Sequence, residues 1–185
     1  MIDGLDGSGK STQAQLILNS LNREGKTVIL RNHPEDDNFF GIKASQFLLS
    51  RGKSAHFAAA LFYIFDVIRS ILIYSWRKVD YIIFVRYLMG AAYLPSPLHK
   101  IAYLFFALVL PRPKKMIFLD AAPKVALSRI EGSRGKKEMF EDLDSLEKVR
   151  VKALSLVLRG KWIIMNSNGP SMDIAAAIRK IVCRS

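Results

Sequence analysis

The sequence has little cysteine and few acidic residues, and it lacks internal repeats and low-complexity tracts. Its one cysteine, Cys183, has no partner in the chain for a disulfide, so we expect a reducing compartment such as the cytoplasm. There are 16 acidic residues against 28 lysines and arginines, which gives a formal net charge of +12. This excess is either a solvated basic surface or a means of attracting phosphorylated small ligands. The hydrophobic share of 50% excludes disorder, and we expect one domain, residues 1–185.

The sequence also lacks a recognisable signal peptide and a convincing membrane span. Residues 101–110 form an apolar run that is too short and is closed by Pro111. Residues 57–74 are long enough, but Asp66 and Arg69 lie near the middle. We therefore expect buried helices of a soluble domain and no membrane partner. Nucleic acid is not expected either, because no basic motif with interleaved aromatics is present.

Strand-like runs alternate with helix-like ones, which predicts an α/β protein with a parallel sheet and helices on both faces. Short apolar runs bounded by charge predict strands at 27–30, 81–85, 116–119 and 162–165. Amphipathic spacing predicts helices at 38–49, 123–130 and 143–157. Ser54 would cap a further long helix that continues toward Trp76, and Ser171 would cap the closing helix.

The stretch from Gly4 to Thr12 reads G-L-D-G-S-G-K-S-T and matches the phosphate-binding pattern G-x-x-x-x-G-K-[S/T]. Its backbone N–H groups would form an anion nest beside the positive end of the next helix. Lys10 would reach the β- and γ-phosphates of a nucleotide, and the Ser11 hydroxyl would bind Mg²⁺. The residues expected to hold the nucleotide are Gly4, Asp6, Gly7, Ser8, Gly9, Lys10, Ser11 and Thr12.

A strand should precede this loop, yet only Met1, Ile2 and Asp3 do so. Either N-terminal residues are missing from the chain or the first strand is unusually short, and we favour the first explanation.

The stretch 3–13 resembles the start of thymidylate kinases, and so do L-D-A-A-P-K-V-A-L-S-R-I at 119–130 and E-K-V-R at 147–150. The resemblance implies a P-loop fold of the nucleoside-monophosphate-kinase type, with three α/β/α layers and a five-stranded parallel sheet. It also implies Mg²⁺-dependent transfer of the γ-phosphoryl group of ATP to dTMP, giving dTDP. Relatives are commonly homodimers, and the apolar residues 57–74 could supply such an interface.

The same resemblance suggests roles at the acceptor. Asp6 would face the sugar hydroxyl of dTMP, or it is a turn residue that accepts backbone N–H bonds. Phe65 and Arg69 share one helix face, so Phe65 would stack on thymine while Arg69 contacts the base. The alternatives are Phe62 as the stacking residue, or a core Phe65 beside an Arg69 that pairs with Asp66.

Residues 131–142 resemble the lid of these kinases. Gly7 occupies a position where some relatives carry a catalytic arginine, and relatives with glycine there use a lid arginine instead. Arg134 is therefore the first candidate for the charge-stabilising residue, and Arg129 is the second. The expected catalytic residues are Lys10, Arg134 and Arg86, with Arg86 also clamping the acceptor phosphate.

Three residues depart from the family pattern. Val85 replaces an aspartate that helps to organise Mg²⁺, and Asp3 could substitute as a metal ligand. Asp36 replaces an arginine that binds the acceptor phosphate, and Leu94 replaces a glutamine that reads the base. The leading prediction is a thymidylate kinase. The alternatives are a P-loop kinase for another nucleoside monophosphate or small acceptor, and a nucleotide-binding protein with little kinase activity.

Overall fold

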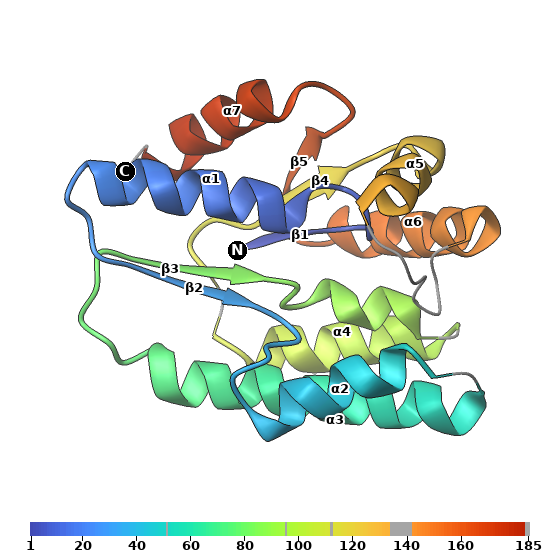
Figure 1. Ribbon diagram of the computed structural model, residues 1–185. Coiled ribbons are helices and arrows are strands. Elements are labelled where there is room, and N and C mark those ends of the chain that lie inside the picture. Colours follow the sequence, from blue (N-terminus) through green and yellow to red (C-terminus); the bar gives the residue numbers. More distant parts are fainter. Residues whose placement is uncertain (51, 95, 112, 134–141, 184–185) are drawn as a thin grey trace.

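Five parallel strands form the centre of the molecule (Figure 1). The computed structural model describes residues 1–50, 52–94, 96–111, 113–133 and 142–183. The strand order β2-β3-β1-β4-β5 places the first strand in the middle of the sheet. The strands are β1 (Ile2–Gly4), β2 (Val28–Asn32), β3 (Tyr81–Val85), β4 (Ile117–Asp120) and β5 (Ile163–Asn166). The predicted parallel α/β sheet is confirmed.

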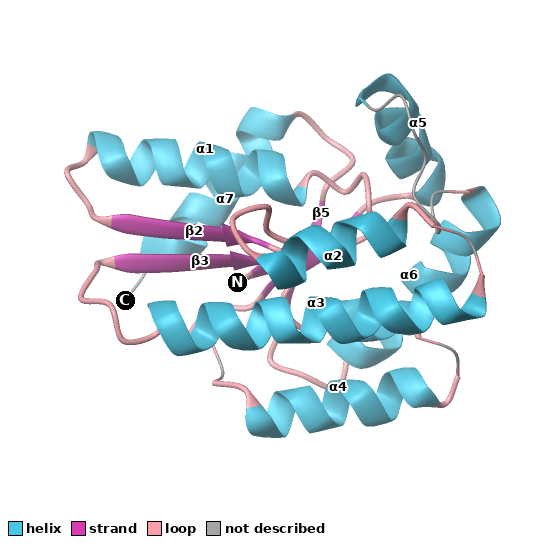
Figure 2. Ribbon diagram, turned by 60° about the horizontal axis from the view of Figure 1, so that its bottom comes forward, coloured by secondary structure: helices cyan, strands magenta, loops and turns pink. Residues whose placement is uncertain are grey.

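Helices cover both faces of the sheet, as Figures 1 and 2 show. One face carries α1 (Lys10–Arg23) and α7 (Ser171–Cys183), and the other carries the longer helices α3 and α6 together with α4. The remaining bounds are α2 (Phe39–Leu48), α3 (Lys53–Tyr74), the 3₁₀ helix η1 (Met89–Tyr93), α4 (Leu98–Val109), α5 (Pro123–Ser133) and α6 (Leu143–Val157).

Alternation along the central strands divides the core into two layers. In β3, Ile83 and Val85 pack into the cluster with α1 and α7, whereas Phe84 packs into the cluster with α3 and α6. In β4, Ile117 and Leu119 belong to the cluster with α1 and α7. Successive side chains of a strand point to opposite faces of the sheet, so the sheet lies between the two clusters. Both faces of these strands are buried, which explains why they are continuous apolar runs in the sequence.

Two predictions about the helices need correction. Ser54 does not cap α3; Gly52 is the N-cap residue and no side chain bonds there. The apolar runs are also less buried than predicted, because only 28% of the window Phe57–Tyr74 is buried inside the molecule. Among the described residues, one helix is long and apolar enough to cross a membrane by length and composition alone, and it contains this window. In α4, Leu108 is 70% exposed.

The carboxyl ends of the strands bring distant segments together. The loop after β1 begins the phosphate-binding motif, residues 33–38 follow β2, and residues 86–88 follow β3. Since β1 lies beside β3 in the sheet, the first and third of these segments are neighbours. Parallel sheets bind ligands at such an edge, where the strand order reverses.

Candidate functional site

The phosphate-binding loop has the backbone geometry that its glycines allow. Gly7 and Gly9 have φ angles of 72° and 91°, in the left-handed region that side chains disfavour. Gly9 ends the loop, and α1 begins at the next residue, so the positive end of the helix points to the loop. A Cβ on Gly7 would lie 2.3 Å from the carbonyl oxygen of Ala126 in α5. The position where some relatives carry an arginine is therefore closed by the neighbouring helix.

A cavity of about 360 Å³ lies over this loop. Arg129 of α5 also lines it, and its Nη2 donates a 2.9 Å hydrogen bond to the carbonyl oxygen of Ser167. Because the cavity combines an anion nest with a cation, it suits a polyphosphate, and we call it the donor cavity. Its lining residues include every position from Gly7 to Gln13, together with Arg86, Arg129 and Ser167.

A buried cluster of opposite charges lies next to the donor cavity. Asp6 Oδ1 accepts a 2.8 Å hydrogen bond from Arg86 Nη2 and lies 3.5 Å from Lys10 Nζ. The other oxygen of Asp6 accepts a 2.6 Å hydrogen bond from the hydroxyl of Tyr93 in η1. Burial alone would raise the pKa of Asp6, but the charges of Lys10 and Arg86 outweigh it and hold that pKa well below its usual range. Asp6 is thus a carboxylate that orients two cations.

Arg86 is held from several sides. Its φ angle of 56° is positive, which is uncommon for a residue with a side chain and typical of functional sites. The hydroxyl of Tyr63 in α3 donates to the carbonyl oxygen of Arg86. Burial would lower the pKa of this guanidinium, but Asp6 keeps the pKa above its ordinary value. Arg86 lines both the donor cavity and a second cavity beyond it.

Asp3 is buried and has hydrogen-bond partners on both oxygens. Its Oδ2 accepts from the backbone N–H groups of Tyr87, Leu88 and Met89 at 3.0, 3.2 and 3.0 Å. Its Oδ1 accepts from the N–H of Gly4 at 3.1 Å. This side chain ties β1 to the segment after β3 that carries Arg86. Its proposed contact with a metal stays a prediction, and it would compete with these four hydrogen bonds.

Ser11 is the residue best suited to a metal ion. Its exposed hydroxyl lies at the start of α1 and donates a 3.2 Å hydrogen bond to Asn32 Oδ1. No group of three or more His, Cys, Asp or Glu residues converges on a metal position in the described chain. A hydroxyl without a carboxylate cage fits Mg²⁺, which binds mainly through substrate phosphates and water. Val85 adds no ligand, because its side chain packs in the core beside α1.

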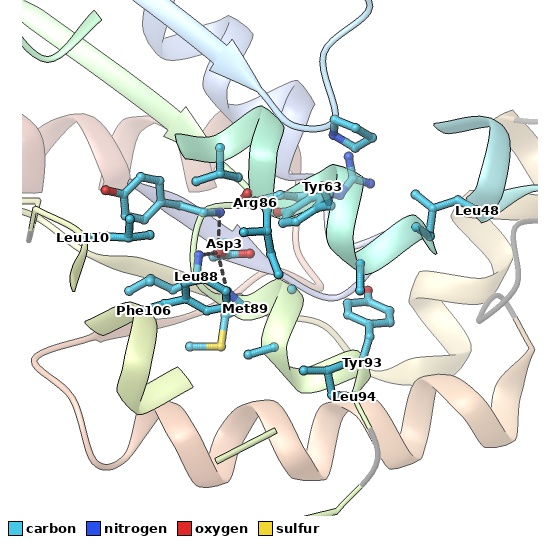
Figure 3. Close-up of a pocket in the computed structure, with 18 of the residues that line it drawn as sticks. Asp3, Leu48, Tyr63, Arg86, Leu88, Met89, Tyr93, Leu94, Phe106 and Leu110 are labelled. Atoms are coloured by element: carbon cyan, nitrogen blue, oxygen red, sulfur yellow. Dashed lines mark hydrogen bonds between the residues drawn. The ribbon is translucent and has the colours of Figure 1, made fainter. Parts of the chain in front are cut away.

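The second cavity has a volume of about 470 Å³ and lies between α3, η1 and α4 (Figure 3). We call it the acceptor cavity. Asp6, Arg86 and Tyr93 line it at the end next to the donor cavity. On α3, its walls are Tyr63, Ile64, Val67 and Ile68 with residues nearer the start of that helix.

Phe65 and Arg69 are not among the residues that line this cavity. They lie on the side of α3 that meets α2, where the rings of Phe65 and Phe40 are 5.4 Å apart. Arg69 lies 3.7 Å from Asp37, so its partner is not the predicted Asp66. Base binding by this pair stays a prediction, and Tyr63 occupies the cavity side of the helix instead.

The segment after β2 is fixed to α3 by the buried carboxylate of Asp66. Its Oδ2 lies 2.8 Å from His33 Nδ1 and accepts a 2.9 Å hydrogen bond from the N–H of Glu35. Its Oδ1 accepts a 2.7 Å hydrogen bond from Asn38 Nδ2. Asp36 is exposed on this loop.

Sequence reasoning missed two tyrosines of the site, Tyr63 and Tyr93. Both act through a hydroxyl bonded to the Asp6–Arg86 pair, and an apolar helical pattern gives no signal for such a role. The prediction for Arg134 and most of the lid, residues 131–142, lies outside the described residues.

A parallel α/β sheet with a phosphate-binding loop after its central strand defines a P-loop nucleotide-binding protein. A family model described as thymidylate kinase matches residues 2–178. The chain belongs to the thymidylate kinase family, whose members are nucleoside-monophosphate kinases.

Curated relatives agree with this membership. The chain is similar to a thymidylate kinase of Xanthomonas oryzae pv. oryzae, with 30% identity over 171 residues that cover 88% of this chain and 73% of the relative. It is also similar to a probable thymidylate kinase of Archaeoglobus fulgidus, with 28% identity over 187 residues that cover 98% of this chain and 92% of the relative.

Proposed function

We propose that this chain transfers the γ-phosphoryl group of ATP to dTMP, giving ADP and dTDP. The observation that carries the proposal is the position of Arg86, which lines both the donor cavity and the acceptor cavity. A cation between two anions neutralises the charge that builds as a phosphoryl group passes in line from one to the other. Family membership supports dTMP as the acceptor.

Each residue then has a distinct task. Lys10 binds the β- and γ-phosphates of ATP, and Ser11 holds Mg²⁺, which when bound draws negative charge from the phosphate oxygens. Arg86 clamps the acceptor phosphate, while Asp6 keeps its guanidinium oriented through the 2.8 Å hydrogen bond. Arg134 remains the first candidate for the remaining positive charge.

A coupled assay of ADP release with ATP, Mg²⁺ and a panel of nucleoside monophosphates tests the proposal. We expect turnover with dTMP, and a loss in kcat/KM of at least about a hundredfold in Arg86→Ala. Arg77→Ala is the matched control, because Arg77 is exposed beyond the end of α3. We expect its kcat/KM to equal that of the wild type.

Two other functions remain, and both are supported by Val85, whose side chain is 0% exposed and apolar where the family pattern has a carboxylate. Turnover with a different monophosphate would favour a kinase for another acceptor. ATP binding without turnover of any acceptor would favour a nucleotide-binding protein with little activity. A cytoplasmic location stays a prediction that rests on the lone Cys183.

A further inference from the structure

The acceptor cavity extends well beyond the residues that would meet a phosphate. Its volume of about 470 Å³ falls within the usual range for small-molecule sites. In Figure 3, Asp3 and Arg86 lie near the centre, with Leu48 and Leu94 toward one side and Phe106 and Leu110 toward the other. The charged groups therefore occupy a small part of a long cavity.

The walls away from Asp6 and Arg86 are apolar. Hydrocarbon side chains come from the end of α2, from α3, from η1 and the residue after it, and from α4, which are separate in the sequence. The main contributors are Leu48, Ile64, Val67, Met89, Leu94 and Phe106.

The hydroxyl and carboxylate groups of the described lining residues have partners within the protein, whereas Arg86 uses Nη2 to bind Asp6 and its other donors remain for a phosphate. The hydroxyl of Tyr63 donates to Arg86, and that of Tyr93 donates to Asp6. The hydroxyl of Tyr87 donates to the carbonyl oxygen of Pro111 at 3.1 Å. Asp3 accepts its four backbone hydrogen bonds. A polar base edge placed against the apolar walls would stay unpaired, and each such group weakens binding by about tenfold.

We propose that the acceptor cavity selects a phosphate monoester with an apolar group larger than the methyl of thymine. This inference rests on the proposed kinase function and names the substrate class of the same site. The apolar group can be a substituent on a nucleotide base or the whole alcohol of a non-nucleotide ester. In either case an acceptor phosphate oxygen attacks the γ-phosphorus of ATP, the bond to the β-phosphate oxygen breaks, and ADP leaves with a diphosphate ester as product.

The test compares acceptors of increasing apolar size on the wild-type protein. One series is dUMP, dTMP and dUMP with an ethyl, propyl or butyl group at the 5-position; the other is ethyl, butyl and octyl monophosphate. We expect affinity, measured by calorimetry, and kcat/KM, measured by ADP release, to rise about fourfold per buried methylene in at least one series. The series that rises identifies the source of the apolar group.

Two failures are distinguishable. If dTMP is turned over but neither series gains with size, the apolar selection is wrong and the kinase function stands. If no acceptor is turned over, the kinase function fails, and the calorimetric series still decides whether the cavity selects apolar esters.

A pair of matched variants locates the effect in the cavity. Ala60 lines the cavity on α3, whereas Ala58 of the same helix does not. Ala60→Phe should fill part of the space and remove the gain of the longest esters, while Ala58→Phe should keep it. Equal profiles for the two variants, with unchanged melting temperatures, would overturn the assignment.

Discussion

Asp6 and Asp3 show how two carboxylates in one loop region come to have different tasks. Asp6 lies among cations, so its charge is compensated and its pKa is held low. Asp3 lies among backbone N–H groups, and burial, its largest influence, raises its pKa. The first can therefore position charged side chains toward ligands, whereas the second fixes the backbone that carries them.

Replacing Asp6 by Asn should leave Lys10 and Arg86 without their anionic partner. Because the pair is largely buried, we expect the free energy of unfolding at neutral pH to fall by about 3 kcal/mol. The wild type should lose this contribution as the pH falls below about 4, since the folded pKa of Asp6 lies under the unfolded value. Denaturant unfolding over a pH series measures both effects. Equal pH profiles for the variant and the wild type would contradict the assignment.

Replacing Asp3 by Asn should lower stability by about 1–3 kcal/mol, because an amide oxygen is a weaker acceptor for the buried N–H groups of residues 87–89. The Mg²⁺ concentration for half-maximal activity should stay unchanged if Asp3 only holds the backbone. A shift in that concentration would instead support Asp3 as a metal ligand. Thermal unfolding and a Mg²⁺ titration of ADP release distinguish these outcomes.

Lys10 gives a prediction for the pH dependence of ATP binding. Burial lowers the pKa of Lys10 to about 8, and phosphates bound beside it favour the charged form. The free protein therefore loses the Lys10 proton above that pH and must take it up again to bind ATP. Calorimetry in buffers of different ionisation enthalpy should show uptake of about one proton near pH 9. In Lys10→Arg, whose guanidinium stays charged, the uptake should vanish.

Helix α3 shows which features could be predicted from the sequence and which could not. The four-residue spacing of Phe65 and Arg69 correctly places them on one side of a helix. It does not identify the side that faces the site, because α3 is apolar around most of its circumference. The strands at 28–32, 81–85, 117–120 and 163–166 are predicted within two residues, because buried parallel strands produce short continuous apolar runs. The Asp6–Arg86 contact joins residues far apart in sequence, so spacing alone could not predict it.

The contact between α5 and the phosphate-binding loop gives a test at the level of elements. In Gly7→Ala, the positive φ of 72° and the overlap with Ala126 should lower stability by about 1–3 kcal/mol and weaken ATP binding about tenfold. Gly132 of the same helix α5 has open space around its Cβ position. Gly132→Ala should therefore leave the stability unchanged or raise it by up to about 0.5 kcal/mol. Melting curves and ATP calorimetry check both.

At the scale of the whole molecule, several large apolar side chains are exposed on the surface of the single chain. Trp76 and Leu72 at the end of α3 are 83% and 66% exposed. Leu108 of α4 is 70% exposed as well, although solvent contact with such side chains is unfavourable. Of these residues, Leu72 lies within residues 57–74, and the homodimer interface predicted there stays a prediction.

Light scattering over a range of protein concentrations tests this prediction. We expect the measured mass to approach twice that of one chain. Leu72→Lys should shift the protein toward the monomer, whereas Leu158→Lys, at an equally exposed position beyond α6, should not. A monomeric mass at every concentration would contradict the predicted homodimer.

The closed space at Gly7 also limits how this protein can change by mutation. An arginine there would meet the backbone of α5, and no rotamer change at position 7 can relieve an overlap that begins at Cβ. A single substitution therefore cannot restore a catalytic arginine in the phosphate-binding loop, because α5 would have to move first. The arginine predicted to stabilise the transferring charge therefore has to come from another segment, and Arg86 and Arg134 are the predicted candidates.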